Sequence, residues 1–138
     1  MKSVVSKLVL GLVLGAGIAT SGLCADTIPE VQKRAIAALS EDLLYPEKAK
    51  IRGLASAHSP DGTWITCGYV FPMSSSGVRG RQWTFRVEEK PDDNAFISIA
   101  QDNDGFWIIL EICRKKGVPI LSPEVVSEIP PKLIVPDN

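Results

Sequence analysis

The stretch from Thr63 to Val87 constrains this chain most, because it holds two runs of alternating side chains around a turn-rich segment. In residues 63–71 the side chains that share one face are Ile65, Cys67, Tyr69 and Phe71. In residues 82–88 three apolar side chains (Trp83, Phe85, Val87) alternate with four polar ones (Gln82, Thr84, Arg86, Glu88). A period of two predicts strands, and the polar face indicates a sheet with one side in water. Residues 72–81, rich in serine and glycine, predict an exposed loop.

A helix is predicted before these strands. Thr27-Ile28-Pro29-Glu30 is a capping box with proline near the first helical position, and apolar residues then recur at helical spacing to about Leu44. Pro46 ends this helix, and residues 46–50 predict one more short turn. A strand is expected over residues 51–57, followed by a tight turn at Ser59-Pro60-Asp61-Gly62.

Residues 106–116 permit two interpretations. Three isoleucines favour a strand by propensity. The spacing of Phe106, Ile109, Leu110 and Cys113, with basic residues before Gly117, is typical of a helix, and we prefer the helix. A turn at residues 90–94 and a short strand at residues 95–100 precede it.

These elements predict an α+β fold, in which an N-terminal helix packs on a small antiparallel sheet and a second helix lies near the C-terminus. We expect a signal peptide at residues 1–25, one compact domain at 26–117 and an extended tail at 118–138. That tail holds five of the ten prolines together with many aliphatic residues, so it is expected to lie on the domain or on a partner.

The N-terminus indicates export. Lys2 and Lys7 flank an apolar run over residues 8–18 that is short for a membrane span. The preferred cleavage is after Ala25, with Ser21 as the second site. A lipidated Cys24 is a weaker alternative, because Leu23 is large for that signal. An uncleaved anchor is a further alternative.

Composition and charge exclude one class of partner. The chain has 138 residues, of which 45% are hydrophobic and 22% charged, as in one ordinary globular domain. Without Lys2 and Lys7, 13 basic residues remain against 16 acidic ones, a net charge of −3. We therefore expect no nucleic-acid binding, which requires a basic surface.

Cys67 and Cys113 are the expected disulfide partners. An exported chain enters an oxidising compartment, and both residues lie on faces that we expect to be buried. The alternative is a pair of buried free thiols, since cysteine packs as a small hydrophobe.

Three segments carry a resemblance to a known family. They are residues 45–52 (YPEKAKIR), residues 65–70 (ITCGYV) and, more loosely, residues 80–85 (GRQWTF). In this order they resemble the motifs of a family of small exported proteins of Gram-negative bacteria whose function is unknown. Phe71 stands where that family has asparagine, and Val78-Arg79 stand where it has two glycines. The resemblance implies a compact secreted α+β domain and supplies no catalytic residues.

Catalytic and metal sites are weakly indicated. His58 is the only histidine, and it could activate Cys67 as the nucleophile of a small cell-envelope hydrolase. An exposed turn histidine and a core cysteine are the simpler interpretation. No cluster has metal-ligand spacing, and Asp102-Asn103-Asp104-Gly105 lacks the later glutamate of a calcium loop. We expect no cofactor, no metal and no catalysis.

The best binding candidate is the group Arg79, Arg81, Trp83 and Arg86. Guanidinium groups on a glycine-bearing loop can bind carboxylates or phosphates. Alternatively, Trp83 belongs to the core and the arginines form a solvated rim. The sequence thus predicts a periplasmic or secreted binding domain whose partner is a protein or an anionic ligand. The alternatives are the Cys67–His58 hydrolase and an assembly component that docks through its C-terminal tail.

Overall fold

The structure is a computed structural model that describes residues 26–92 and 95–134. Its elements in chain order are α2 (Ile28–Glu41), η1 (Pro46–Lys48), β1 (Lys50–His58), β2 (Trp64–Phe71), β3 (Trp83–Glu89), β4 (Phe96–Ile99), α3 (Asn103–Lys115), α4 (Pro123–Val126) and β5 (Lys132–Leu133). The expected signal peptide, both cleavage sites and Cys24 lie outside the described residues.

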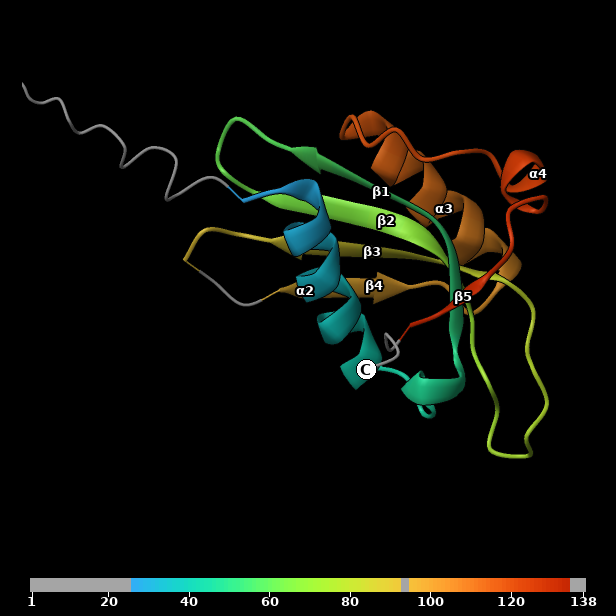
Figure 1. Cartoon of the computed structure of the whole chain (residues 1–138). Coiled ribbons are helices and arrows are strands. Elements are labelled where there is room, and N and C mark those ends of the chain that lie inside the picture. The colour runs from blue at the N-terminus through green and yellow to red at the C-terminus, as the bar shows by residue number, and fades with distance from the viewer. Residues whose placement is uncertain (1–25, 93–94, 135–138) are drawn as a thin grey trace, which may run out of the picture.

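The strands form one antiparallel sheet in the order β4-β3-β2-β1-β5 (Figure 1). Each of the first three strands pairs with the next along the chain, as in consecutive hairpins, whereas β5 pairs with β1. The register between β1 and β2 shifts between Arg52 and Ala55. Gly53 takes a φ of 63° there, and a Cβ at this position would lie 2.8 Å from Val126, so the bulge requires glycine.

The helix α2 covers one face of the sheet. Its capping box is formed as predicted, because Thr27 Oγ1 accepts from the Glu30 backbone N–H while the Glu30 carboxylate accepts from the Thr27 N–H. The apolar side of the helix packs on strand residues that include Val70, Phe85 and Val87. Trp83 packs on the edge of this cluster.

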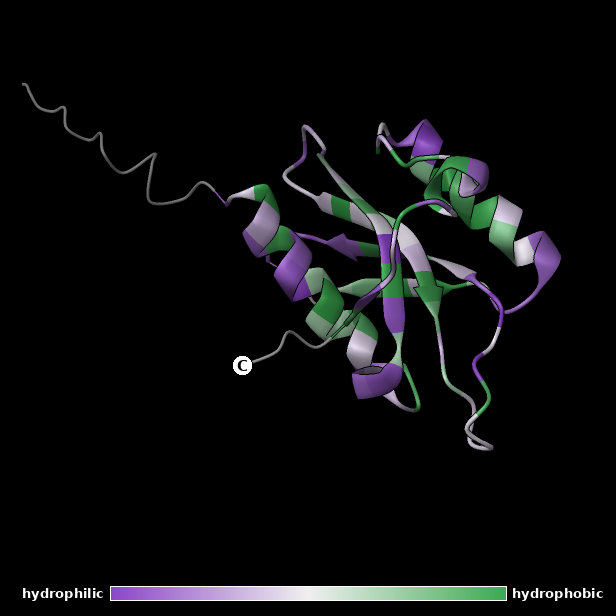
Figure 2. Ribbon diagram, turned by 45° about the vertical axis from the view of Figure 1, so that its right-hand side comes forward, coloured by the Kyte–Doolittle hydropathy of each residue, from purple (hydrophilic) through white to green (hydrophobic). Residues whose placement is uncertain are grey.

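The helix α3 covers the opposite face (Figure 2), so one expectation was wrong. The polar side chains of β3 predicted a solvated face, yet Thr84 is fully buried and Arg86 is mostly buried. The Thr84 hydroxyl donates to the Phe106 carbonyl, which satisfies it beneath the helix. Both faces of the sheet are therefore covered, and the fold has three layers.

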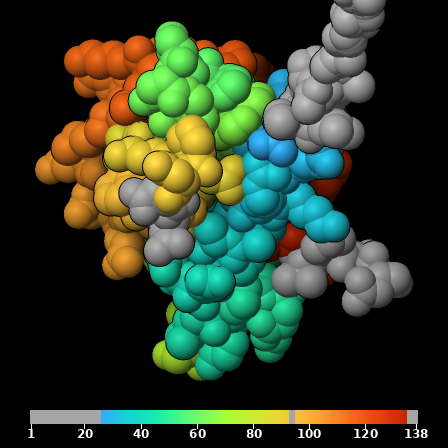
Figure 3. Space-filling model, turned by 90° about the vertical axis from the view of Figure 1, so that its left-hand side faces the viewer, coloured from blue at the N-terminus to red at the C-terminus, as the bar shows by residue number. Residues whose placement is uncertain are grey.

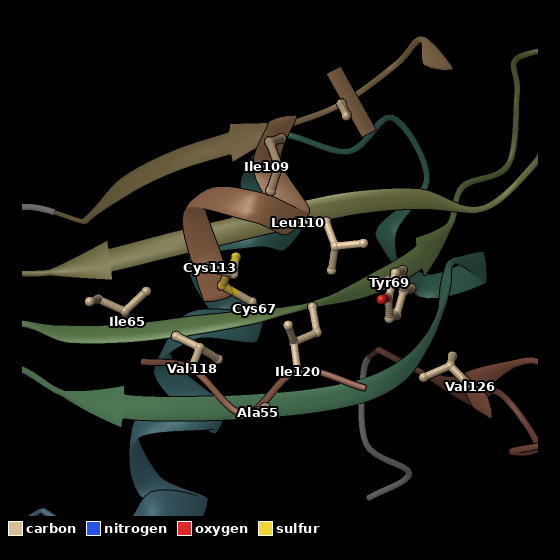
Figure 4. Packing of buried hydrophobic residues seen from close by; sticks show 11 residues of the cluster. Ala55, Ile65, Cys67, Tyr69, Ile109, Leu110, Cys113, Val118, Ile120 and Val126 are labelled. Atoms are coloured by element: carbon tan, nitrogen blue, oxygen red, sulfur yellow. A yellow bond between two sulfur atoms is a disulfide. The ribbon is translucent and has the colours of Figure 1, made fainter. Parts of the chain in front are cut away.

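The helix interpretation of residues 106–116 is confirmed, although α3 begins earlier, at Asn103. Asp102 is the N-cap, and its carboxylate accepts from the Gly105 N–H. Ile109, Leu110 and Cys113 are buried against the sheet (Figure 4), because tertiary packing of an apolar stripe outweighs the strand propensity of the isoleucines.

The segment after Gly117 packs on the domain rather than standing away from it. Val118, Ile120 and Val126 are buried in the cluster beneath α3, and Ile134 is buried in the cluster beneath α2. Between these clusters the chain passes the outer edge of β1, where β5 pairs with Lys50 and Ile51. The tail therefore contributes to the cores on both faces.

Candidate functional site

The two cysteines are joined in a disulfide, as the sequence indicated. The Cys67 and Cys113 sulfur atoms are 2.10 Å apart, both residues are inaccessible to solvent, and the bond links β2 to α3 (Figure 4). A bridged sulfur is not a thiolate, so Cys67 offers no nucleophile in this state. His58 lies at the exposed end of β1, where its ring stacks on Trp64 with centroids 4.3 Å apart.

The arginines of the predicted binding group do not form one cluster. Arg79 donates to the Phe71 carbonyl at 3.1 Å and to the Lys48 carbonyl at 2.9 Å, so it attaches the loop to the domain. Arg86 lies on the α3 side of β3, with its Nε 3.1 Å from the Glu88 carboxylate and its guanidinium over the Phe96 ring. Arg81 is exposed.

The loop that carries Arg79 and Arg81 is exposed, as expected, but it is internally ordered. Met73 and Arg79 form an antiparallel bridge, and the Ser74 N–H donates to the Val78 carbonyl. Gly77 closes the turn with a φ of 81°. The loop is a short extension of the β2–β3 hairpin that presents Arg81 at its base.

A pocket of about 330 Å³ lies beside the start of α3. It includes two members of the predicted group, Arg81 and Trp83. Its other lining residues are Gln82, Gln101, Asp102, Asn103, Phe106, Trp107, Pro123 and Glu124. Three segments that are distant in the sequence therefore meet here: the start of β3, the start of α3 and the start of α4.

Two aromatic rings from α3 form part of the pocket wall. The Phe106 and Trp107 rings meet edge to face, with centroids 5.2 Å apart. The Phe106 ring also packs on the buried Tyr69 ring, with centroids 5.8 Å apart. Trp107 is 47% exposed. Because Phe106 is anchored in the core, it holds the indole of Trp107 as a partly exposed apolar surface.

The polar groups of the pocket are of mixed charge. The lining holds one guanidinium (Arg81) and two carboxylates (Asp102, Glu124), while Gln82, Gln101 and Asn103 add neutral amides. The Gln82 Oε1 atom is buried and has no hydrogen-bond partner in the described part of the chain. A buried acceptor of this kind costs free energy when it is unpaired.

Most of this pocket was missed by sequence reasoning. Trp107 carried the one usable signal, because it lies outside the stripe of Phe106, Ile109 and Leu110 that a helix at this position buries. A large aromatic residue on the solvated side of a helix is informative. The convergence of Gln82, Gln101 and Glu124 could not be read from their spacing.

Within residues 26–92 and 95–134, no group of three His, Cys, Asp or Glu side chains is placed to hold a metal ion. No helix in these ranges has the length and apolar character needed to cross a membrane. No protein family, no curated protein sequence and no solved structure matches this chain.

Proposed function

We propose that this chain is an exported binding protein and that the pocket beside α3 is its ligand site. Export is supported by the charged and apolar N-terminal pattern and is compatible with the Cys67–Cys113 bridge, since disulfides persist in oxidising compartments. The family resemblance at residues 45–52 and 65–70 agrees with a small secreted domain.

The observation that carries the proposal is the composition of the pocket. An exposed indole stands beside amide, carboxylate and guanidinium groups. Small-ligand sites are typically aromatic-lined concavities with a few convergent polar groups, and this volume is at the lower end of their range of about 300–1,000 Å³.

The ligand that fits this chemistry is a saccharide unit. A pyranose ring has an apolar C–H face that packs on an indole, and its hydroxyls both donate and accept hydrogen bonds. Amides and carboxylates offer the complementary planar groups. A dianionic ligand fits less well, because Asp102 and Glu124 would repel it and Arg81 is the one arginine of the predicted group that lines the pocket.

The alternatives have less support from these contacts. The assembly hypothesis needs apolar tail residues for a partner. Val118, Ile120, Val126 and Ile134 are buried within the chain, which leaves Leu121, Val125 and Leu133 as its exposed large apolar residues. The hydrolase hypothesis needs a free Cys67 thiolate, which would require reduction of the bridge.

Calorimetric titration with chitotriose, maltotriose and cellotriose tests the proposal. We expect at least one trisaccharide to bind, and we expect Trp107→Ala to weaken that binding by about tenfold or more, as for a central aromatic contact. Ile108→Ala is the matched control, because Ile108 is the next residue of α3, is 57% exposed and does not line the pocket.

Inorganic phosphate is titrated in parallel to test the anionic ligand that the arginines first suggested. Phosphate binding that Arg81→Ala abolishes, without binding of any trisaccharide, would contradict the saccharide assignment. Equal losses of trisaccharide affinity in Trp107→Ala and Ile108→Ala would show that the pocket is not the binding site.

A further inference from the structure

A second, larger concavity lies on the other side of the sheet. It is a groove of about 630 Å³ between the flank of α2 and the outer edge of the sheet, where β1 meets β5. Figure 3 shows the red C-terminal segment beside the blue and cyan α2. The groove shares no lining residue with the pocket beside α3, so an inference about it is independent of the proposed function.

The groove is apolar with basic residues in its lining. Its apolar lining comes from Pro29, Ile36, Ala37, Ile51, Leu54, Leu133 and Ile134. Lys33 of α2 and Lys132 of β5 also line it, are exposed, and form no ion pair within the described residues. An apolar channel with two unpaired ammonium groups complements a molecule that has an apolar chain and an anionic head.

The edge of the sheet beside the groove is a poor template for an added peptide strand. The ladder between β1 and β5 covers only Lys50 and Ile51, and Pro130-Pro131 precede it without backbone donors. The bulge at Gly53 then interrupts the register of β1. Bulges twist an edge away from strand addition, whereas an alkyl chain needs no backbone ladder.

The dimensions suit a single chain. The lining residues of α2 run from Pro29 to Ser40, which corresponds to about 16 Å along a helix axis. This length accommodates a medium-length alkyl chain lying along α2. The volume is that of a site for one small ligand rather than for a lipid with two acyl chains.

We propose that the groove between α2 and the β1–β5 edge binds one free fatty acid, with its alkyl chain over Ile36 and Leu54 and its carboxylate at Lys33 and Lys132. The chain is held by the removal of apolar surface from water. The carboxylate sets the orientation through exposed ion pairs, which contribute a minor part of the affinity.

Calorimetric titration of the exported protein with decanoate, below its micelle concentration, tests this proposal. We expect saturable binding with a negative heat-capacity change, the signature of buried apolar surface. Ala37→Trp should reduce affinity at least tenfold, because Ala37 is an exposed groove residue and the indole would occupy the channel. Lys115→Trp, an exposed site on α3 outside the groove, is the control and should bind as wild type.

The head group is tested separately. Lys33→Gln with Lys132→Gln should weaken decanoate binding by about fivefold, as expected of exposed ion pairs, and leave decanol binding unchanged. Leu133→Asp, at a 45% exposed groove residue, provides a second blocking variant if Ala37→Trp fails to fold by circular dichroism.

Other occupants give distinct results, each of which would overturn the proposal. Absence of decanoate binding by the folded wild type would do so, as would equal losses in Ala37→Trp and Lys115→Trp. Co-sedimentation with phosphatidylglycerol vesicles without decanoate binding would assign the face to a membrane surface. A dimer in sedimentation that Ala37→Trp breaks and decanoate does not would assign it to a second copy of the chain.

Discussion

Tyr69 of β2 connects the sheet to the C-terminal segment. Its ring is fully buried beneath α3, and its hydroxyl donates to the Leu121 carbonyl in the C-terminal segment. Burial raises the pKa of this phenol to about 12, because the phenolate is poorly solvated there. The nearby Arg114 acts in the opposite direction, with a smaller effect.

Because of this raised pKa, we expect the free energy of unfolding to fall at alkaline pH. The folded state holds the Tyr69 proton more tightly than the unfolded chain, whose phenol has a pKa near 10. The contribution of Tyr69 to the free energy of unfolding is therefore fully present below pH 10 and is lost as the pH rises towards 12. Over that interval we expect a loss of about 1–3 kcal/mol in the free energy of unfolding.

Urea unfolding of wild type and Tyr69→Phe at pH 8, 10 and 11.5 measures this effect. The variant lacks the titrating group, so the decline from pH 10 to 11.5 should be smaller than in wild type, even though Tyr69→Phe is less stable by about 1 kcal/mol at pH 8. Parallel declines in the two proteins would show that Tyr69 does not titrate in this range.

Among the elements, local rules in the sequence were sufficient for α2 and for the strands β1 to β4, whereas the short strand β5 in the tail was not predicted. The Thr27–Glu30 capping box begins the helix as predicted, and residues 59–62 form the predicted turn, with the Gly62 N–H donating to the Ser59 carbonyl. The alternation of side chains along the sequence predicted β2 and β3, because successive residues of a strand face opposite sides of the sheet.

Those local rules did not predict the contacts between segments that are distant in the sequence. Thr84 and Arg86 have the polarity of solvated strand residues, and their burial depends on α3 lying over them. Arg81 and Trp83 were singled out from the sequence, but their pocket is completed by Trp107 and Glu124 from later segments. Spacing along one chain does not specify which distant segments meet.

The C-terminal segment gives a prediction at this scale. Ending the chain after Gly117 removes Val118, Ile120, Val126 and Ile134, and with them the tail's part of the core on both faces. Each fully buried aliphatic side chain stabilises by about 1.5–3 kcal/mol, so the loss is comparable with the whole stability of a domain. We expect the truncated chain to lose its cooperative thermal transition.

A chain that ends after Ile134 keeps these contacts and is the matched control, for which we expect a cooperative transition in calorimetry. A truncated chain with wild-type stability would show that the tail is dispensable and would revive its role as a docking segment.

At the scale of the whole molecule, the disulfide ties the central strand to the covering helix. Cys67 and Cys113 are separated by 46 residues, and the bond between them restricts the unfolded chain. Replacing both with alanine should lower the free energy of unfolding by about 4 kcal/mol. Chemical denaturation of wild type and Cys67→Ala/Cys113→Ala measures the difference, and a loss below about 1 kcal/mol would contradict a stabilising bridge.

The pocket beside α3 is tested most directly by a chemical-shift map of the isotope-labelled protein, titrated with the trisaccharide that binds best. We predict that the largest changes fall on the indole N–H of Trp107 and on the amide groups of Gln82 and Asn103, whereas Ile108→Ala leaves this pattern unchanged. Changes centred on other surfaces, or no saturable change with any of the three trisaccharides, would contradict a saccharide site beside α3.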